Sequence, residues 1–148
     1  MNLILNYRVD PEVAAELLPA QFRPRTVNGH AVAILRLGDR RAEHGIAVES
    51  GVHVLSGESA AFVAEELSGR VYMSFNGSET VDVSARPAHE WESRLFGDAR
   101  AAARFGGMIA AVPVSIDWVR SSYFDRLPAA LDCALLLPDV PVTMDLAA

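Results

Sequence analysis

Apolar and polar side chains alternate along several stretches of the chain, and this two-residue period predicts β-strands. Residues 2–8 and 30–37 show the pattern, the second after an Asn28-Gly29 turn. Residues 131–137 are mostly apolar and lie between prolines, so they fit either a buried strand or a short helix. A longer strand is predicted over residues 109–120. Its even positions should face the core, namely Val112, Val114, Ile116 and Trp118.

Turn residues inside a further alternating stretch, Gly45 to Leu55, predict a β-hairpin. With Ser50-Gly51 as the loop, Val48 would lie opposite His53, and Ile46 would lie opposite Leu55. In this register His44 shares a face with His53.

A second hairpin is predicted to join residues 70–75 to residues 79–83. A three-residue loop, Asn76-Gly77-Ser78, places Met73 opposite Val81 and Val71 opposite Val83. We prefer it to a two-residue loop because only this register keeps one face apolar. The opposite face then carries Tyr72, Ser74, Thr80 and Asp82.

Three short helices are predicted from cap residues. Asp10-Pro11 opens the first, which Pro19 stops. Residues 59–67 form the second, with Ser59 as its cap and Gly69 as its end, and residues 98–105 form the third, closed by Gly106-Gly107. Many strands with few helices predict the α+β class, as a mostly antiparallel β-barrel that is closed or half-closed.

Composition narrows the class of protein. The 148 residues suit a single domain, residues 1–148, and 51% of them are hydrophobic, as in a globular protein. No apolar run is long enough to span a membrane, and the net charge of -6 argues against nucleic-acid binding. The N-terminus does not resemble a secretory signal. The single cysteine, Cys133, excludes an intrachain disulfide. We therefore expect a cytoplasmic protein.

Several short motifs occur in a fixed order from one end of the chain to the other. They are Asn6 to Pro11 with Leu17-Leu18-Pro19 and Phe22-Arg23-Pro24, then Ala42 to Glu49, Ser93 to Phe96 before an alanine-rich helix, Val119 to Asp125, and Leu131 to Leu136. Together they resemble the acetoacetate decarboxylase-like proteins, most of all their uncharacterised branch. The resemblance implies a conical β-barrel that encloses a small-molecule pocket.

In the active decarboxylases of that family, a pocket lysine forms a Schiff base with a β-keto acid. The matching segment would follow Glu58, where this chain has Ser59-Ala60-Ala61. All 13 cationic residues are arginine, so no lysine can take this role. The chain is also shorter in the middle than typical relatives. The resemblance therefore supports the fold better than the activity.

Glu43, Glu58 and His53 are the candidate catalytic residues. The two glutamates loosely match acidic positions of the family pocket, where an apolar barrel would raise a carboxyl pKa toward neutrality. The alternative is that each lies in solvent. His53 would act as an acid, a base or a hydrogen-bond donor, or would be a polar residue at the barrel mouth.

Arg36, Tyr72 and Trp118 are the candidate substrate-binding residues. Arg36 could hold a carboxylate bidentately, although an arginine in a strand more often points outward. The aromatic rings would line a cavity, or else belong to the core. We expect Arg40-Arg41 to be a solvated loop and Cys133 to be buried and inert.

No metal or other cofactor is expected. In the predicted hairpin His44 and His53 lie about four residues apart along the strands, which is roughly 13 Å and too far for one ion. Three functions stay open: an enzyme that acts on a keto-acid, lactone or polyketide-like metabolite without a lysine, a noncatalytic ligand-binding module, and a homodimer assembled through exposed barrel edges. We favour a small-molecule-binding barrel with acid/base catalysis.

Overall fold

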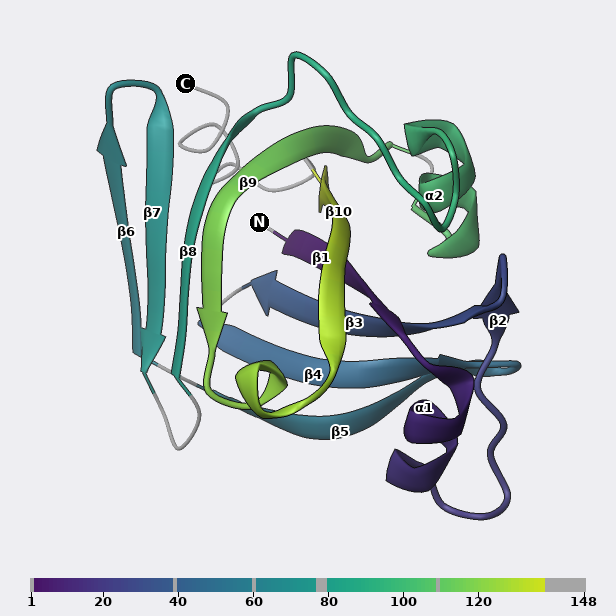
Figure 1. Ribbon diagram of the computed structural model, residues 1–148. Coiled ribbons are helices and arrows are strands. Elements are labelled where there is room, and N and C mark those ends of the chain that lie inside the picture. The colour runs from purple at the N-terminus through teal and green to yellow at the C-terminus, as the bar shows by residue number, and fades with distance from the viewer. Residues whose placement is uncertain (1, 39, 60, 77–79, 109, 138–148) are drawn as a thin grey trace.

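A single antiparallel sheet dominates the computed structural model, which describes residues 2–38, 40–59, 61–76, 80–108 and 110–137. Within those residues the strand order is β5-β4-β3-β1-β10-β9-β8-β7-β6, and the short β2 pairs with β3. The sheet curls into a half-barrel, and α1 and α2 lie away from the β6–β7 hairpin (Figure 1). None of the described helices is long and apolar enough to cross a membrane. The predicted mostly antiparallel sheet is confirmed, and of the two predicted forms, closed and half-closed, the structure has the half-closed one.

The described elements are ten strands and three short helical segments. The strands are β1 (Asn2–Val9), β2 (Thr26–Val27), β3 (His30–Gly38), β4 (Arg41–Val48), β5 (Gly51–Ser59), β6 (Ala61–Leu67), β7 (Arg70–Asn76), β8 (Thr80–Pro87), β9 (Val112–Ser121) and β10 (Ala129–Leu137). The helices are α1 (Pro11–Leu17), α2 (Ala99–Phe105) and the 3-10 turn η1 (Phe124–Arg126).

Both capped helices form where their cap residues predict them. The Asp10 side chain accepts a hydrogen bond from the Glu12 amide at 2.8 Å, and the Asp98 side chain accepts one from the Ala101 amide at 2.8 Å. The apolar stretch 131–137, which the pattern left open, is a strand, because it pairs with β1 along its length.

The helix predicted over residues 59–67 is wrong. Strand β5 continues to Ser59, and residues 61–67 form β6, which pairs with β7 from Ala61 to Leu67. A helix of this length has little stability of its own, whereas the β7 edge offers hydrogen-bond partners for the backbone of a whole strand. The consecutive strands β5 and β6 therefore lie at opposite ends of the strand order.

Both predicted hairpins form, but each register differs from the prediction by two residues. Ile46 lies opposite His53, with Glu49-Ser50 at the turn, and Met73 lies opposite Val83. A shift of two residues returns every side chain to the same face, so the apolar pattern cannot distinguish the two registers. The predicted apolar face of the second hairpin is confirmed, since Val71, Met73 and Val83 are buried. Its predicted loop falls partly on residues 77–79, outside the described residues.

A β-bulge corrects the predicted core face of β9. The register with β8 shifts between Ser84 and Ala85, so that Trp118 pairs with Ser84 while Ile116 pairs with Ala85. Asp117 is the extra residue, and beyond it the faces exchange. Trp118 is therefore 42% exposed, while Val119 packs against the core. Val112, near the other end of the strand, is also exposed.

The concave side of the curled sheet is filled by apolar side chains. The main core includes Leu3, Leu5, Leu35, Met73 and Phe75, each at most 1% exposed. Two smaller clusters join the outer face of the sheet to α2 and to the segment that precedes it. Their buried members are Val32, Ala47 and Leu95 in one and Ala102, Cys133 and Leu135 in the other. The sheet is thus covered on both sides near α2.

Candidate ligand-binding groove

A groove of about 380 Å³ lies on the outer face of β1, β3, β4 and β5. Side chains alternate along a strand, so the residues that do not enter the core face this groove. Most of them come from alternate positions of the four strands and from the chain around the end of α2. The others are Leu137 at the end of β10 and His44, whose ring is buried against Tyr123 and Phe124. The lining is Asn2, Ile4, Asn6, Ile34, Arg36, Gly38, Arg41, Glu43, His44, Gly45, Val52, Val54, Phe105, Gly106, Met108 and Leu137.

Much of the groove wall is apolar. Val52 and Val54, two residues apart on the terminal strand β5, are 49% and 45% exposed and so present a continuous apolar surface. Gly45 lets β4 and β5 approach closely here, because a Cβ at this position would lie 2.6 Å from Val52 Cγ1 and 2.9 Å from the His53 carbonyl oxygen. A wall of this kind suits an apolar ligand surface.

The polar part of the groove is a cluster of three charged side chains. Arg36 and Glu43 are directly opposite on β3 and β4, and their side chains form an ion pair through Nη2 and Oε2. Arg41, two residues before Glu43 and therefore on the same face, pairs with Oε1 through Nε. The arginine side chains are 52% and 55% exposed, whereas Glu43 is 13% exposed. One carboxylate thus holds two half-exposed guanidinium groups.

Opposing effects act on the pKa of Glu43, and their net result is a value below the usual one. Burial raises it, but the hydrogen bonds and positive charges of Arg36 and Arg41 together lower it by more. Glu43 is therefore a stable carboxylate at neutral pH. The expectation that an apolar pocket raises the pKa of this carboxyl is wrong for Glu43.

The structure brings together only some of the predicted site residues. Arg36 and Glu43 meet in the groove. The half-buried His53 is not among the groove residues, and its ring lies 4.9 Å from that of Phe22. Glu58 on β5 lies opposite Ala42 on β4, and its side chain is outside the part of the chain that the structure describes.

Tyr72 and Trp118 lie on β7 and β9, away from the groove, with ring centroids 6.3 Å apart. Trp118 is exposed, so it belongs neither to the core nor to a cavity shared with Arg36. The six predicted residues therefore do not form one site.

The two histidines considered for a metal have separate environments. His44 is buried, its Nε2 lies 2.7 Å from Ser121 Oγ, and its ring packs against Tyr123 and Phe124. Among the described residues, no three His, Cys, Asp or Glu side chains are grouped as they would be around a metal ion.

Arg41 and Met108 are among the groove residues that the sequence analysis does not identify. Arg41 was expected in a solvated loop, but β4 begins there, and its spacing of two from Glu43 could have placed both on one strand face. Met108 follows α2, and its side chain lies over Gly106, since a Cβ at Gly106 would be 2.5 Å from Met108 Cε. No local signal indicates that this segment returns to the sheet.

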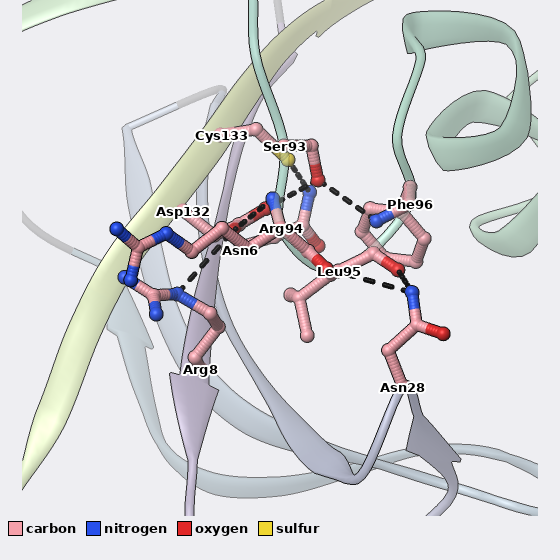
Figure 2. A network of polar contacts seen from close by, with 9 residues as sticks. All are labelled: Asn6, Arg8, Asn28, Ser93, Arg94, Leu95, Phe96, Asp132 and Cys133. Carbon is pink, nitrogen blue, oxygen red and sulfur yellow. Dashed lines mark hydrogen bonds and ion pairs between the residues drawn. The ribbon is translucent and has the colours of Figure 1, made fainter.

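A polar network around the buried carboxylate of Asp132 fixes the segment before α2 to the sheet (Figure 2). Asp132 on β10, whose side chain is 2% exposed, accepts hydrogen bonds from the Ser93 hydroxyl and from the Arg94 amide, and it pairs with Arg8 Nε at 3.3 Å. Nearby, Asn28 Nδ2 donates to the Leu95 carbonyl at 2.7 Å. These contacts hold in place the chain that leads to one wall of the groove.

Cys133 lies in the same region, and its environment disfavours a reactive thiolate. Asn6 Nδ2 donates to its sulfur at 3.7 Å. Burial, together with the negative charge of Asp132, raises the pKa of the thiol to about 12. The expectation of a buried thiol is confirmed, and the raised pKa makes a nucleophilic role unfavourable.

Fold and site together define a small antiparallel half-barrel with a filled interior and a partly apolar groove on its outer face. Comparison of the chain with protein-family models, with curated proteins and with solved structures finds no match.

Proposed function

We propose that the protein binds a small, partly apolar molecule in the outer-face groove and acts as a binding module. The observation that carries this proposal is the groove itself, where exposed valines and a pair of arginines line one volume of about 380 Å³. That volume is at the lower end of the range for ligand pockets.

The ionisation state of Glu43 favours a binding function over a catalytic one. A general acid needs a pKa near the working pH, but Glu43 is held ionised between two arginines. Of the other titratable residues in the catalytic hypothesis, His53 is not among the groove residues, and Glu58 has a side chain outside the described part of the structure. Acid/base chemistry on a keto-acid or lactone stays a prediction from the sequence.

The test is titration with a small neutral solvatochromic dye such as Prodan, monitored by fluorescence. We expect saturable binding to one site. Val54→Trp should fill the groove and weaken binding at least tenfold, whereas Val112→Trp should leave it unchanged. Val112 is a matched control, because it is equally exposed, at 46%, on a strand outside the groove. Absence of saturable binding, or equal binding by both variants, would contradict the proposal.

An acetoacetate decarboxylase-like relationship is also proposed, supported by the order of the sequence motifs and by the curled antiparallel sheet. The filled interior is a difference from the pocket-enclosing barrel that the resemblance implies. The cytoplasmic location expected from composition stays a prediction.

Homodimerisation is a second candidate property. Within the described residues β5 pairs only with β4, and β6 pairs only with β7, so each presents one edge to a second copy. Light scattering after gel filtration tests it, and a monomer mass at micromolar concentration would contradict it.

A further inference from the structure

We propose that the ligand of the groove is an amphipathic monocarboxylate, whose carboxylate binds Arg36 and Arg41 while its apolar part lies along the valine wall. This inference rests on the proposed binding function and assigns the chemical class of the ligand.

Charge is the first argument. Arg36 and Arg41 carry two positive charges and Glu43 carries one negative charge, so the cluster has a formal charge of +1. A ligand with a single negative charge neutralises this cluster. A phosphate monoester, at about -1.5 to -2 near neutral pH, would leave excess negative charge beside Glu43.

Hydrogen-bond donors are the second argument. Each guanidinium has five N–H groups in a planar fork. The ion pairs with Glu43 are made by Nη2 of Arg36 and by Nε of Arg41, and both side chains are about half exposed. The other guanidinium nitrogens can therefore donate to a second carboxylate. Glu43 thus acts as a positioning residue that orders two long side chains before the ligand arrives.

The apolar wall and the volume of the groove determine the size and the apolar character of the rest of the ligand. Ile4, Ile34, Val52 and Val54 offer a surface that a short alkyl chain or a small ring would cover. A volume of 380 Å³ corresponds to about a dozen water molecules at ~30 Å³ each. Decanoate, with about twelve non-hydrogen atoms, is therefore a suitable probe.

The experiment is isothermal titration calorimetry at pH 7 with decanoate and decyl phosphate below their critical micelle concentrations and with decanol below its solubility limit. We expect decanoate to bind at least tenfold more tightly than decanol and no more weakly than decyl phosphate. Arg36→Gln and Arg41→Gln should each weaken decanoate binding about tenfold and decanol binding by much less. Arg23→Gln, an exposed arginine outside the groove, is the matched control and should bind like the original protein.

The outcomes separate this proposal from the one on which it rests. Equal affinity for decanoate and decanol would overturn the carboxylate assignment and leave binding in the groove intact. Decyl phosphate binding tenfold more tightly than decanoate would assign the site to phosphate instead. If neither decanoate nor decanol binds, and the neutral dye also fails to bind, both proposals fall. Circular dichroism of each variant ensures that lost affinity does not reflect unfolding.

Discussion

The two faces of strands β1, β3 and β4 have different roles. The inner face carries Leu3, Leu5 and Leu35 into a core that fills the half-barrel. On the outer face, one part is covered by α2 and the segment before it, and the neighbouring part is left open as the groove. The same strands can thus provide stability on one side and a binding surface on the other, because successive side chains point in opposite directions.

The largest expected effect compares two neighbours on β3. Leu35 is fully buried in the core, while Ile34 is partly buried and lines the groove. Leu35→Ala should lower the free energy of unfolding by about 2–5 kcal/mol, and Ile34→Ala by less than half as much. Urea unfolding of both variants measures this difference. Equal losses would mean that the two faces contribute equally to stability.

The close approach of β4 and β5 gives the next effect. In Gly45→Ala the new methyl group would lie 2.9 Å from the His53 carbonyl oxygen. A backbone atom in a sheet cannot move away as easily as the end of a side chain can. We expect a loss of about 1–3 kcal/mol. Pairing this substitution with Val52→Ala relieves only the side-chain contact, so most of the loss should persist in urea unfolding. Full recovery would show that Val52 alone sets the constraint.

The polar network around Asp132 should affect the free energy of unfolding by a similar or smaller amount. Asp132→Asn removes the charge that faces Arg8 while keeping the shape of the side chain. We expect a loss of about 1–2 kcal/mol, because a buried ion pair loses one partner but Arg8 keeps partial access to water. Hydrogen exchange of residues 93–96 should rise more than that of β7. A uniform increase would indicate that the network has no local role.

The smallest effect concerns Glu43. Because its pKa is lower in the folded protein than the usual 4.5, its contribution to stability is present above pH 4.5 and is lost as the pH falls through the folded value. Glu43→Gln should be less stable than the original protein at pH 7 by less than about 1 kcal/mol, since both arginines are half exposed. The difference should shrink at pH 3. Urea unfolding at both pH values tests this, and a difference that grows on acidification would contradict it.

Much of the fold could be predicted, but little of the site. Arg36 and Glu43 are both candidates from the sequence, but the functional role predicted for them is in a pocket inside the barrel, and Phe75 and its neighbours fill that interior. The pattern of a strand shows that its two faces differ, and it does not show which face stays open. That depends on where α2 and Met108 pack, and no residue near Arg36 in the sequence carries that information.

The sequence by itself determined most strand positions, both capped helices, the apolar face of the β7–β8 hairpin and the lack of a Schiff-base lysine. These are local properties, set by caps, by turn residues and by alternation. Only the tertiary structure decided the hairpin registers, the bulge at Asp117, the strand at residues 61–67 and the place of the groove. Each of these depends on pairing or packing between distant segments, and a pattern with a period of two residues is the same for every register shifted by two.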